Sequence, residues 1–170
     1  SFAVPFRKGQ ISALRFLTDQ DKSLGQGPLQ VFTDAGVFTC NAPIDRTEWS
    51  TVTYPIITQS AMDFGAEGQR STILVNSDMF YRSKDGIRSW IVSRREWREW
   101  AQTPISEEVN EILRADPVNL LEFGSSVVFD KRFLITCAPQ VTAQGIVHRG
   151  LIAMDLAPVS KMVQTAQARY

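Results

Sequence analysis

The chemistry open to this chain is limited by its single histidine, His148, among 170 residues. A zinc site built on histidines, or a Cys–His site, needs more such ligands than the sequence supplies. A serine–histidine–aspartate triad would have to recruit His148, yet the sequence has no G-x-S-x-G nucleophile motif. There is no P-loop, and the GQGP segment at residues 25–28 is too short for a dinucleotide-binding fingerprint. We therefore interpret His148 as a structural, hydrogen-bonded residue and predict no catalytic residue, metal site or cofactor.

The sharpest local pattern is the octapeptide SKDGIRSW at residues 83–90. It resembles the Asp-box, S-x-D-x-G-x-T-W, which occurs on propeller hairpins in sialidases and in other families. Ser83, Asp85 and Trp90 keep that spacing, Ser89 stands at the threonine position, and Gly86 comes one position early. A carboxylate in such a turn accepts hydrogen bonds within its own loop, glycine gives the tight bend, and tryptophan packs beneath it. The resemblance implies a structural device away from any active site, and we predict a structural turn.

A second possibility for chemistry lies in the pair Tyr81-Arg82, with Arg88, Arg94 and Arg95 close in sequence. Sialidase-like enzymes use a tyrosine nucleophile, an arginine cluster and acid/base carboxylates. Glycosidase chemistry needs two carboxylates at a defined separation, and this sequence does not single out such a pair. The arginine-containing N-terminal motif typical of that family is also missing. A sialidase-like or glycan-binding protein is therefore the alternative hypothesis, and a protein without catalysis is the favoured one.

Aromatic and charged residues alternate in the segment RREWREW at residues 94–100. Tryptophan and arginine are enriched in the hot spots of protein interfaces. The simplest interpretation is packing, with one tryptophan covering a nearby helix; a subunit interface and a ligand or nucleic-acid contact are the alternatives. The candidate interface residues are Arg94, Arg95, Trp97, Arg98 and Trp100.

The elements that would position these residues recur three times as tight hairpins around Asp34, Asp78 and Asp130, spaced by 44 and 52 residues. Each copy is a β-rich run, an acidic turn residue and a second β-rich run. A related landmark, MDFG at 62–65 and LEFG at 121–124, precedes the second and third hairpins. A period of this length in an all-β chain is typical of blades stacked around an axis. We predict an all-β chain of about three β-propeller-type blades in a single domain over residues 1–170.

Individual elements follow from local patterns. Strands are expected at residues 10–17 and 29–33, and the Asp34–Gly36 turn should use Gly36 in a positive-φ conformation before the strand VFTC. The second unit is expected to begin near residue 51, and the apolar segment LIAMDL at 151–156 to lie inside. One inserted α-helix is predicted over residues 104–115, with Thr103 as N-cap, Pro104 in the first turn and Asp116-Pro117 as the stop. It should pack on the outside of a sheet.

Composition excludes several classes of protein. Eighteen basic and eighteen acidic residues cancel, which argues against binding nucleic acid through overall positive charge. No apolar run is long enough for a membrane helix, and no signal-peptide pattern is visible. We interpret the two cysteines, Cys40 and Cys137, as small buried residues rather than a disulfide. Because the chain begins with Ser-Phe-Ala-Val-Pro, we expect a processed chain or a piece of a longer protein.

Beyond the octapeptide, the segments YRSKDGIRSW, WREWAQTPIS, LLEFGSSVVFDKRFLITCAP and VHRGLIAMDLAPVS carry a wider resemblance. In that order and spacing, over roughly residues 25–160, the chain is similar to β-propeller structural proteins of tailed bacteriophages, including nozzle-type tail components. The resemblance implies a non-enzymatic virion subunit, assembled in the host cytoplasm with other tail subunits into a homo-oligomeric ring through which DNA passes. Its expected partners are proteins, without membrane insertion. A cellular protein-interaction propeller is a further alternative.

Overall fold

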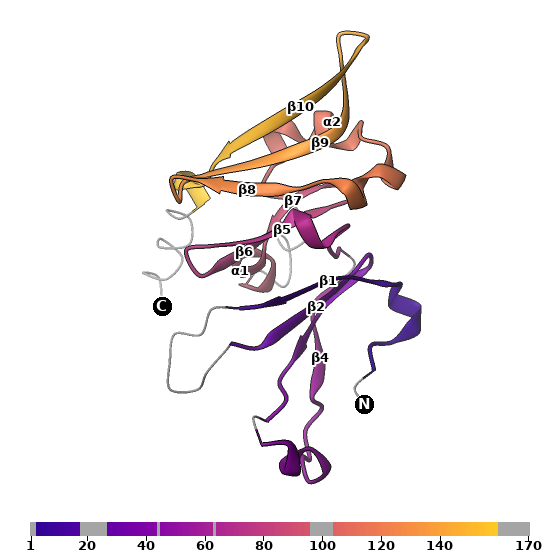
Figure 1. Cartoon of the computed structure of the whole chain (residues 1–170), viewed down its shortest axis with the longest axis vertical. Helices are drawn as coiled ribbons and strands as arrows, with labels where there is room; N and C mark the ends of the chain where they lie inside the picture. Colours follow the sequence, from indigo (N-terminus) through magenta and orange to yellow (C-terminus); the bar gives the residue numbers. More distant parts are fainter. Residues whose placement is uncertain (1–2, 18–26, 44, 63, 96–103, 160–170) are drawn as a thin grey trace.

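Three antiparallel sheets, stacked one after another along the long axis of the molecule, make up the computed structural model (Figure 1). The structure describes residues 3–17, 27–43, 45–62, 64–95 and 104–159. The sheets follow the chain: the first has the strand order β1-β2-β3-β4, the second β5-β6-β7 and the third β10-β9-β8. Each is therefore a simple meander of consecutive strands. The all-β prediction is confirmed at this level.

The strands are β1 (Ile11–Phe16), β2 (Leu29–Thr33), β3 (Gly36–Cys40), β4 (Ile57–Met62), β5 (Thr72–Val75), β6 (Asp78–Ser83), β7 (Gly86–Ser89), β8 (Ser126–Phe129), β9 (Phe133–Ala143) and β10 (Ile146–Asp155). The short α-helices are α1 (Trp90–Arg95) and α2 (Asn110–Arg114). Turns of 3₁₀-helix are η1 (Phe6–Lys8), η3 (Arg46–Ser50), η4 (Gln69–Ser71), η5 (Glu107–Val109) and η6 (Val118–Phe123).

The middle sheet is buried on both faces, because its strand β6 alternates between two hydrophobic cores. Successive side chains of a strand point to opposite faces. Met79 and Tyr81 belong to the core shared with the first sheet, whereas Phe80 belongs to the core shared with the third. Every residue of β6 is buried. This double burial makes the second sheet the centre of the molecule.

The first core lies between the first and second sheets and comprises Ala13, Phe32, Val37, Ala66, Met79, Tyr81 and Trp90. The second core lies between the second and third sheets, with Val75, Phe80, Ile87, Leu113, Leu134 and Leu156 as its buried members. The rings of Phe32 and Tyr81 meet across the first interface with centroids 5.2 Å apart. Each sheet thus packs face to face on the next through apolar side chains.

The first strands of successive sheets also lie close together. Strand β5 contacts β8, and β1 contacts η4, the turn immediately before β5. The Gln69 side chain pairs with both backbone groups of Leu14, accepting from its N–H at 2.7 Å and donating to its carbonyl oxygen at 3.0 Å. Arg15 Nε donates to Thr72 Oγ1 at 3.0 Å. These hydrogen bonds connect the first sheet to the second along the edge formed by the first strands.

All three predicted hairpins are present, as β2–β3, β5–β6 and β8–β9. Asp34 and Asp130 lie in their turns as expected, but Asp78 does not. The second turn is formed by Asn76 and Ser77, both at positive φ, and Asp78 is the first residue of β6. Asparagine favours this conformation in two-residue hairpin turns, which explains the shift. Gly36 is likewise the first residue of β3, outside the positive-φ residues, so its predicted role in the turn is wrong.

Three boundaries differ from the prediction. Strand β4 pairs with β3, so residues 57–62 belong to the first sheet rather than to the second unit. The segment 151–156, most of it in the edge strand β10, lies inside on one side only: Ile152, Met154 and Leu156 contribute to the second core, whereas Leu151 is 74% exposed. The single helix predicted at 104–115 is a 3₁₀ turn followed by the five-residue α2. Leu113 of α2 joins the second core, so this segment closes an inter-sheet space instead of covering an outer face.

In the described part of the chain, no helix has the length and apolar character that crossing a membrane requires. Cys40 is a free, half-buried thiol. Burial raises the pKa of this thiol, while a backbone hydrogen bond with Ala42 opposes the shift. The side chain of Cys137 lies outside the described residues.

Candidate functional site

The Asp-box-like segment forms the two-residue turn between β6 and β7, with Lys84 and Asp85 at its tip. Ser83 Oγ lies 2.7 Å from Asp85 Oδ1 and 2.9 Å from the Gly86 carbonyl oxygen, both acceptors for its proton. Arg88 Nη2 donates to Asp85 Oδ2 at 2.6 Å, and Arg88 Nε donates to Ser83 Oγ at 3.2 Å. The carboxylate therefore accepts hydrogen bonds within its own hairpin, as the pattern predicts.

Arg88 carries a charge in a buried position, 1% exposed. A buried charge is tolerated when it is paired and hydrogen-bonded. Asp85 supplies the countercharge, and the Arg88 guanidinium carbon lies 3.9 Å from the centroid of the Phe64 ring, a cation–π contact. Register pairs Arg88 with Tyr81, so this group lies on the face of the second sheet that meets the first core. We call Ser83, Asp85 and Arg88 the turn network.

Gly86 has a different role from the one expected. It is the first residue of β7 and not the bend itself. A Cβ at this position would lie 2.6 Å from Asn110 Oδ1 and 2.7 Å from both Pro104 Cβ and Ser106 Oγ. Glycine is required here because the 104–110 segment approaches the strand closely.

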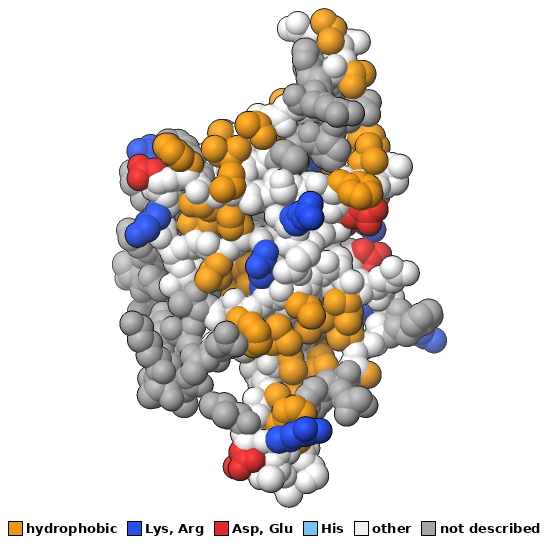
Figure 2. Space-filling model, in the orientation of Figure 1, with side chains coloured by type: hydrophobic (Ala, Val, Ile, Leu, Met, Phe, Trp, Pro, Cys, Tyr) orange, Lys and Arg blue, Asp and Glu red, His pale blue; other side chains and the backbone are white. Residues whose placement is uncertain are grey.

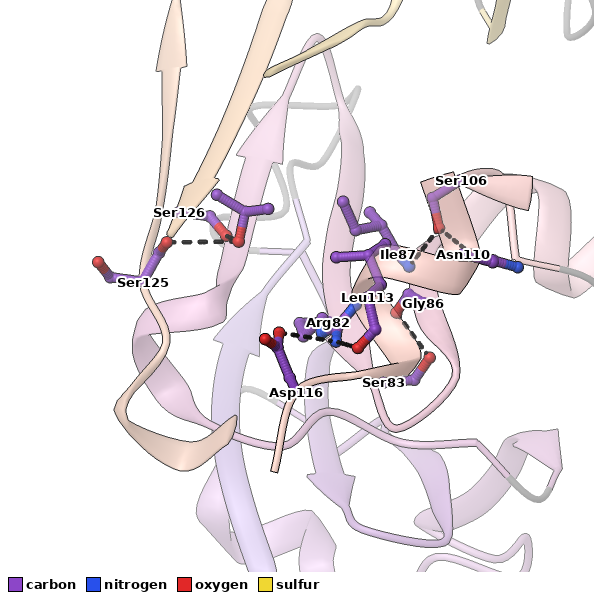
Figure 3. A network of polar contacts seen from close by, with 11 residues as sticks. Arg82, Ser83, Gly86, Ile87, Ser106, Asn110, Leu113, Asp116, Ser125 and Ser126 are labelled. Carbon is purple, nitrogen blue, oxygen red and sulfur yellow. Dashed lines mark hydrogen bonds and ion pairs between the residues drawn. The ribbon is translucent and has the colours of Figure 1, made fainter. Parts of the chain in front are cut away.

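That segment runs along the outer edge of β7 (Figure 3). The Ile87 N–H donates to Ser106 Oγ at 2.9 Å, and the Ile105 N–H donates to the Ile87 carbonyl oxygen at 2.9 Å. Ser106 Oγ in turn donates to Asn110 Oδ1 at 2.7 Å. These bonds satisfy backbone groups that an edge strand would otherwise leave open.

A second charged pair lies on the opposite face of the second sheet. Arg82 Nη2 donates to the Leu113 carbonyl oxygen at 2.5 Å and to Asp116 Oδ2 at 3.3 Å (Figure 3). The two side chains are 5% and 1% exposed. Burial lowers the pKa of Arg82 and raises the pKa of Asp116, and each shift is opposed by the partner's charge. The pair fastens β6 to the end of α2.

Asp78, displaced from its expected turn, holds the start of α1. Its carboxylate accepts from the backbone N–H of Met79 at 2.7 Å and of Ile91 at 3.0 Å, and from the Ser89 hydroxyl. Ser89 Oγ accepts from the Val92 N–H at 3.2 Å, as a helix N-cap does. This arrangement sets Trp90, 3% exposed, into the first core. The tryptophan packs beneath the hairpin as the pattern predicts.

Of the residues in the sialidase-like hypothesis that the structure describes, Arg88 lies on the same face of the second sheet as Tyr81, whereas Arg82 does not. Tyr81 and Arg82 are consecutive in β6, so their side chains point to opposite faces. Tyr81 is 1% exposed within the first core, and burial raises the pKa of its hydroxyl to about 12. Arg82 faces Asp116 on the other side. A buried neutral phenol separated from that arginine lacks the access that a nucleophile needs.

The predicted interface segment at residues 94–100 falls largely outside what the structure describes. Arg94 and Arg95 lie at the end of α1, but their side chains are outside the described residues, as are Trp97, Arg98, Trp100 and Thr103. The side chain of His148, in β10, is also outside. Within the ranges that the structure describes, no group of three or more histidine, cysteine, aspartate or glutamate side chains could hold a metal ion.

Sequence reasoning missed Ser106, Asn110 and the partnership of Arg82 with Asp116. Ser106 is 19 positions from Ile87 and Asp116 is 34 positions from Arg82, whereas Asn110 bonds to Ser106 four positions away. Asp116 was recognisable only as a helix stop. Only the folded structure shows these partnerships, since no sequence motif connects the residues.

Comparison with known proteins identifies no matching family model, curated protein or solved structure. The site must therefore be interpreted from its geometry. The Arg88–Asp85 and Arg82–Asp116 ion pairs lie on opposite faces of the second sheet, and Arg82, Arg88 and Asp116 are buried. Such an arrangement fixes the shape of hairpins and the spacing of sheets.

Proposed function

We propose that this chain is a non-enzymatic structural subunit of a bacteriophage tail or related virion assembly. Its three sheets would serve as propeller-type blades in a ring built with other copies and other tail subunits. The identity of the assembly rests on the sequence resemblance to phage propeller proteins described above.

The observation that carries the proposal is the stacking of three consecutive meanders with their first strands side by side. Blades of a propeller are antiparallel meanders arranged around a common centre. Face-to-face packing through the first and second cores, and the contact of β5 with β8, agree with that arrangement. Such an arrangement supports a function based on shape and contact.

The polar networks support the same proposal. The turn network and the Arg82–Asp116 pair use their charges to bind one another and the backbone. A rigid wall needs hairpins that hold their geometry, and buried charge-assisted hydrogen bonds supply it. A glycan-cleaving protein would instead need accessible carboxylates at a set separation.

The experiment is mass spectrometry of virion particles that are purified from a lysate of cells infected with the phage that encodes this chain. The same particles are examined by electron microscopy. We expect the polypeptide in the particles at several copies each, and density that accommodates three stacked sheets. Recovery of the protein only from the particle-free fraction would overturn the proposal. Hydrolysis of a glycoside panel by the purified chain, lost in Tyr81→Phe, would replace it with the glycosidase alternative.

A further inference from the structure

Two buried polar atoms of the Arg82–Asp116 pair have no hydrogen-bond partner among the described residues. Arg82 Nη2 donates to the Leu113 carbonyl oxygen at 2.5 Å and to Asp116 Oδ2 at 3.3 Å. The second terminal nitrogen, Arg82 Nη1, and the second carboxylate oxygen, Asp116 Oδ1, are buried and unpaired. The two side chains are 5% and 1% exposed, so solvent at the protein surface does not supply the missing bonds.

An unpaired donor beside an unpaired acceptor is unfavourable inside a protein. On folding, each atom loses its hydrogen bonds to water, and native proteins almost always replace them. Charged side chains at the surface, which Figure 2 shows in small scattered groups of both signs, can bond to solvent instead. Arg82 Nη1 and Asp116 Oδ1 need a partner within the fold.

The geometry of the ion pair explains why the two atoms do not satisfy each other. A guanidinium and a carboxylate in the bidentate arrangement share two parallel hydrogen bonds of about 2.7–2.9 Å. Here the Leu113 carbonyl oxygen and Asp116 Oδ2 both contact the same nitrogen, Nη2, and the ion-pair contact is longer, at 3.3 Å. The carboxylate therefore meets one end of the guanidinium through one oxygen only.

A single small molecule is able to reach both unpaired atoms. Nη1 and Nη2 are bonded to the same carbon of Arg82, and Oδ1 and Oδ2 to the same carbon of Asp116, so the unpaired atoms belong to groups already in contact. The molecule must accept a hydrogen bond from Nη1 and donate one to Oδ1. It must also be uncharged, because the ion pair is neutral and a further buried charge would have no countercharge. Water meets these requirements, and buried water in proteins bonds to polar groups that are otherwise unsatisfied.

We propose that one ordered water molecule is bound between Arg82 and Asp116, accepting a hydrogen bond from Nη1 and donating one to Oδ1. Burial lowers the pKa of Arg82 and raises the pKa of Asp116, and a water in this position favours the charged form of both. The joint between β6 and the segment after α2 is then partly water-mediated. This site does not depend on the chain being a virion subunit.

A crystal structure of the parent chain, at a resolution that shows ordered water, is the first test. We expect one peak of electron density at about 2.7–3.2 Å from both Nη1 and Oδ1. A bidentate pair, with Nη1 bonded directly to Oδ1, would overturn the proposal. Protein side chains filling the space between the two atoms would overturn it as well.

Magnetic relaxation dispersion of the water oxygen nucleus, which counts long-lived internal water in solution, is the second test. The double variant Arg82→Met, Asp116→Leu removes donor and acceptor together and should hold one such water fewer than the parent. Arg132→Met is the matched control, because it breaks an arginine–aspartate pair whose arginine is 55% exposed, and it should hold the same number as the parent. Equal numbers in the parent and the double variant would contradict the proposed water. Circular dichroism checks that the variants fold, and if the double variant does not, the crystal structure of the parent decides.

Discussion

Arg82 and Asp116, 34 residues apart in sequence, form an ion pair at 3.3 Å with both side chains almost completely buried. The pair joins the central strand to the segment that follows α2. Asp116→Leu should lower the free energy of unfolding by roughly 3–5 kcal/mol, because it leaves the Arg82 charge buried without its carboxylate. Chemical denaturation of the purified variant measures this loss.

Replacing both partners provides the control for that experiment. Arg82→Met with Asp116→Leu removes the buried charge altogether, and such exchanges are often neutral or stabilising. We expect the double variant to be more stable than Asp116→Leu alone. If Asp116→Leu and the double variant were equally stable, the unpaired charge of Arg82 would not be the cause of the loss in the single variant.

Gly86→Ala should destabilise the protein by about 1–3 kcal/mol, since the added methyl group would overlap Asn110, Pro104 and Ser106. Gly150→Ala is the matched control, because nothing lies within 4 Å of a Cβ built there. The comparison of melting temperatures reports the close approach of the 104–110 segment together with the positive φ of Gly86 (158°). Similar losses in both variants would contradict it.

The carboxyl of Glu67 predicts how the stability of the fold changes with pH. Burial raises the pKa of its carboxyl, while Lys84 and Arg82 oppose the shift and Asp34 adds to it. A carboxyl with a raised folded-state pKa favours the fold in its protonated form. Its contribution is complete below the unfolded-state pKa and is lost as the pH rises through the folded-state value. Glu67→Gln should therefore be more stable than the parent at pH 7. The difference should shrink as the pH falls through the raised folded-state pKa, and it should be smallest below the unfolded-state value of 4.5.

The hydroxyl of Tyr81 should ionise only at high pH. Burial raises the pKa of its hydroxyl to about 12, so this group favours the fold up to its unfolded-state pKa of about 10 and loses that contribution as the pH rises through 12. Ultraviolet difference titration of the parent against Tyr81→Phe should reveal this component. A component titrating near 10 would show that the hydroxyl is accessible, and would restore it as a candidate nucleophile.

Asp85→Ala tests the structural role of the turn network. Removing the carboxylate takes away the ion pair of a fully buried arginine and one acceptor of Ser83. The expected loss is about 1.5–3 kcal/mol, typical of a hydrogen bond to a charged group. Lys84→Ala changes the exposed neighbour in the same turn, where the ion pair with Asp34 at 3.7 Å contributes little, and should change stability by well under 1 kcal/mol.

Features that depend on neighbouring residues could be predicted from the sequence. The hairpins at Asp34 and Asp130, the self-contained bonding of Ser83 with Asp85, and the burial of Trp90 all follow from local spacing. The sequence predicts the second turn at Asp78 because acidic residues are common in turns. The turn lies instead at Asn76 and Ser77, which adopt the positive φ values that it needs.

Features that depend on distant packing could not be predicted. The helical spacing of Ile105, Val109, Ile112 and Leu113 predicts one apolar side for this segment. Ile105, Val109 and Leu113 contribute to the second core, whereas Ile112 is 40% exposed. The spacing did not reveal that helical backbone would start only at Glu107, with a 3₁₀ turn before α2, because the bonds of Ile105 and Ser106 with Ile87 hold residues 104–106 along β7. Tertiary contacts override helix propensity there.

The membership of β6 in both cores has a consequence for how the molecule comes apart. Neither the first nor the third sheet can detach without exposing one side of the same strand, so loss of either interface weakens the other. We therefore expect the three meanders to melt in a single cooperative transition, and cleavage between any two of them to yield fragments that do not stay folded separately.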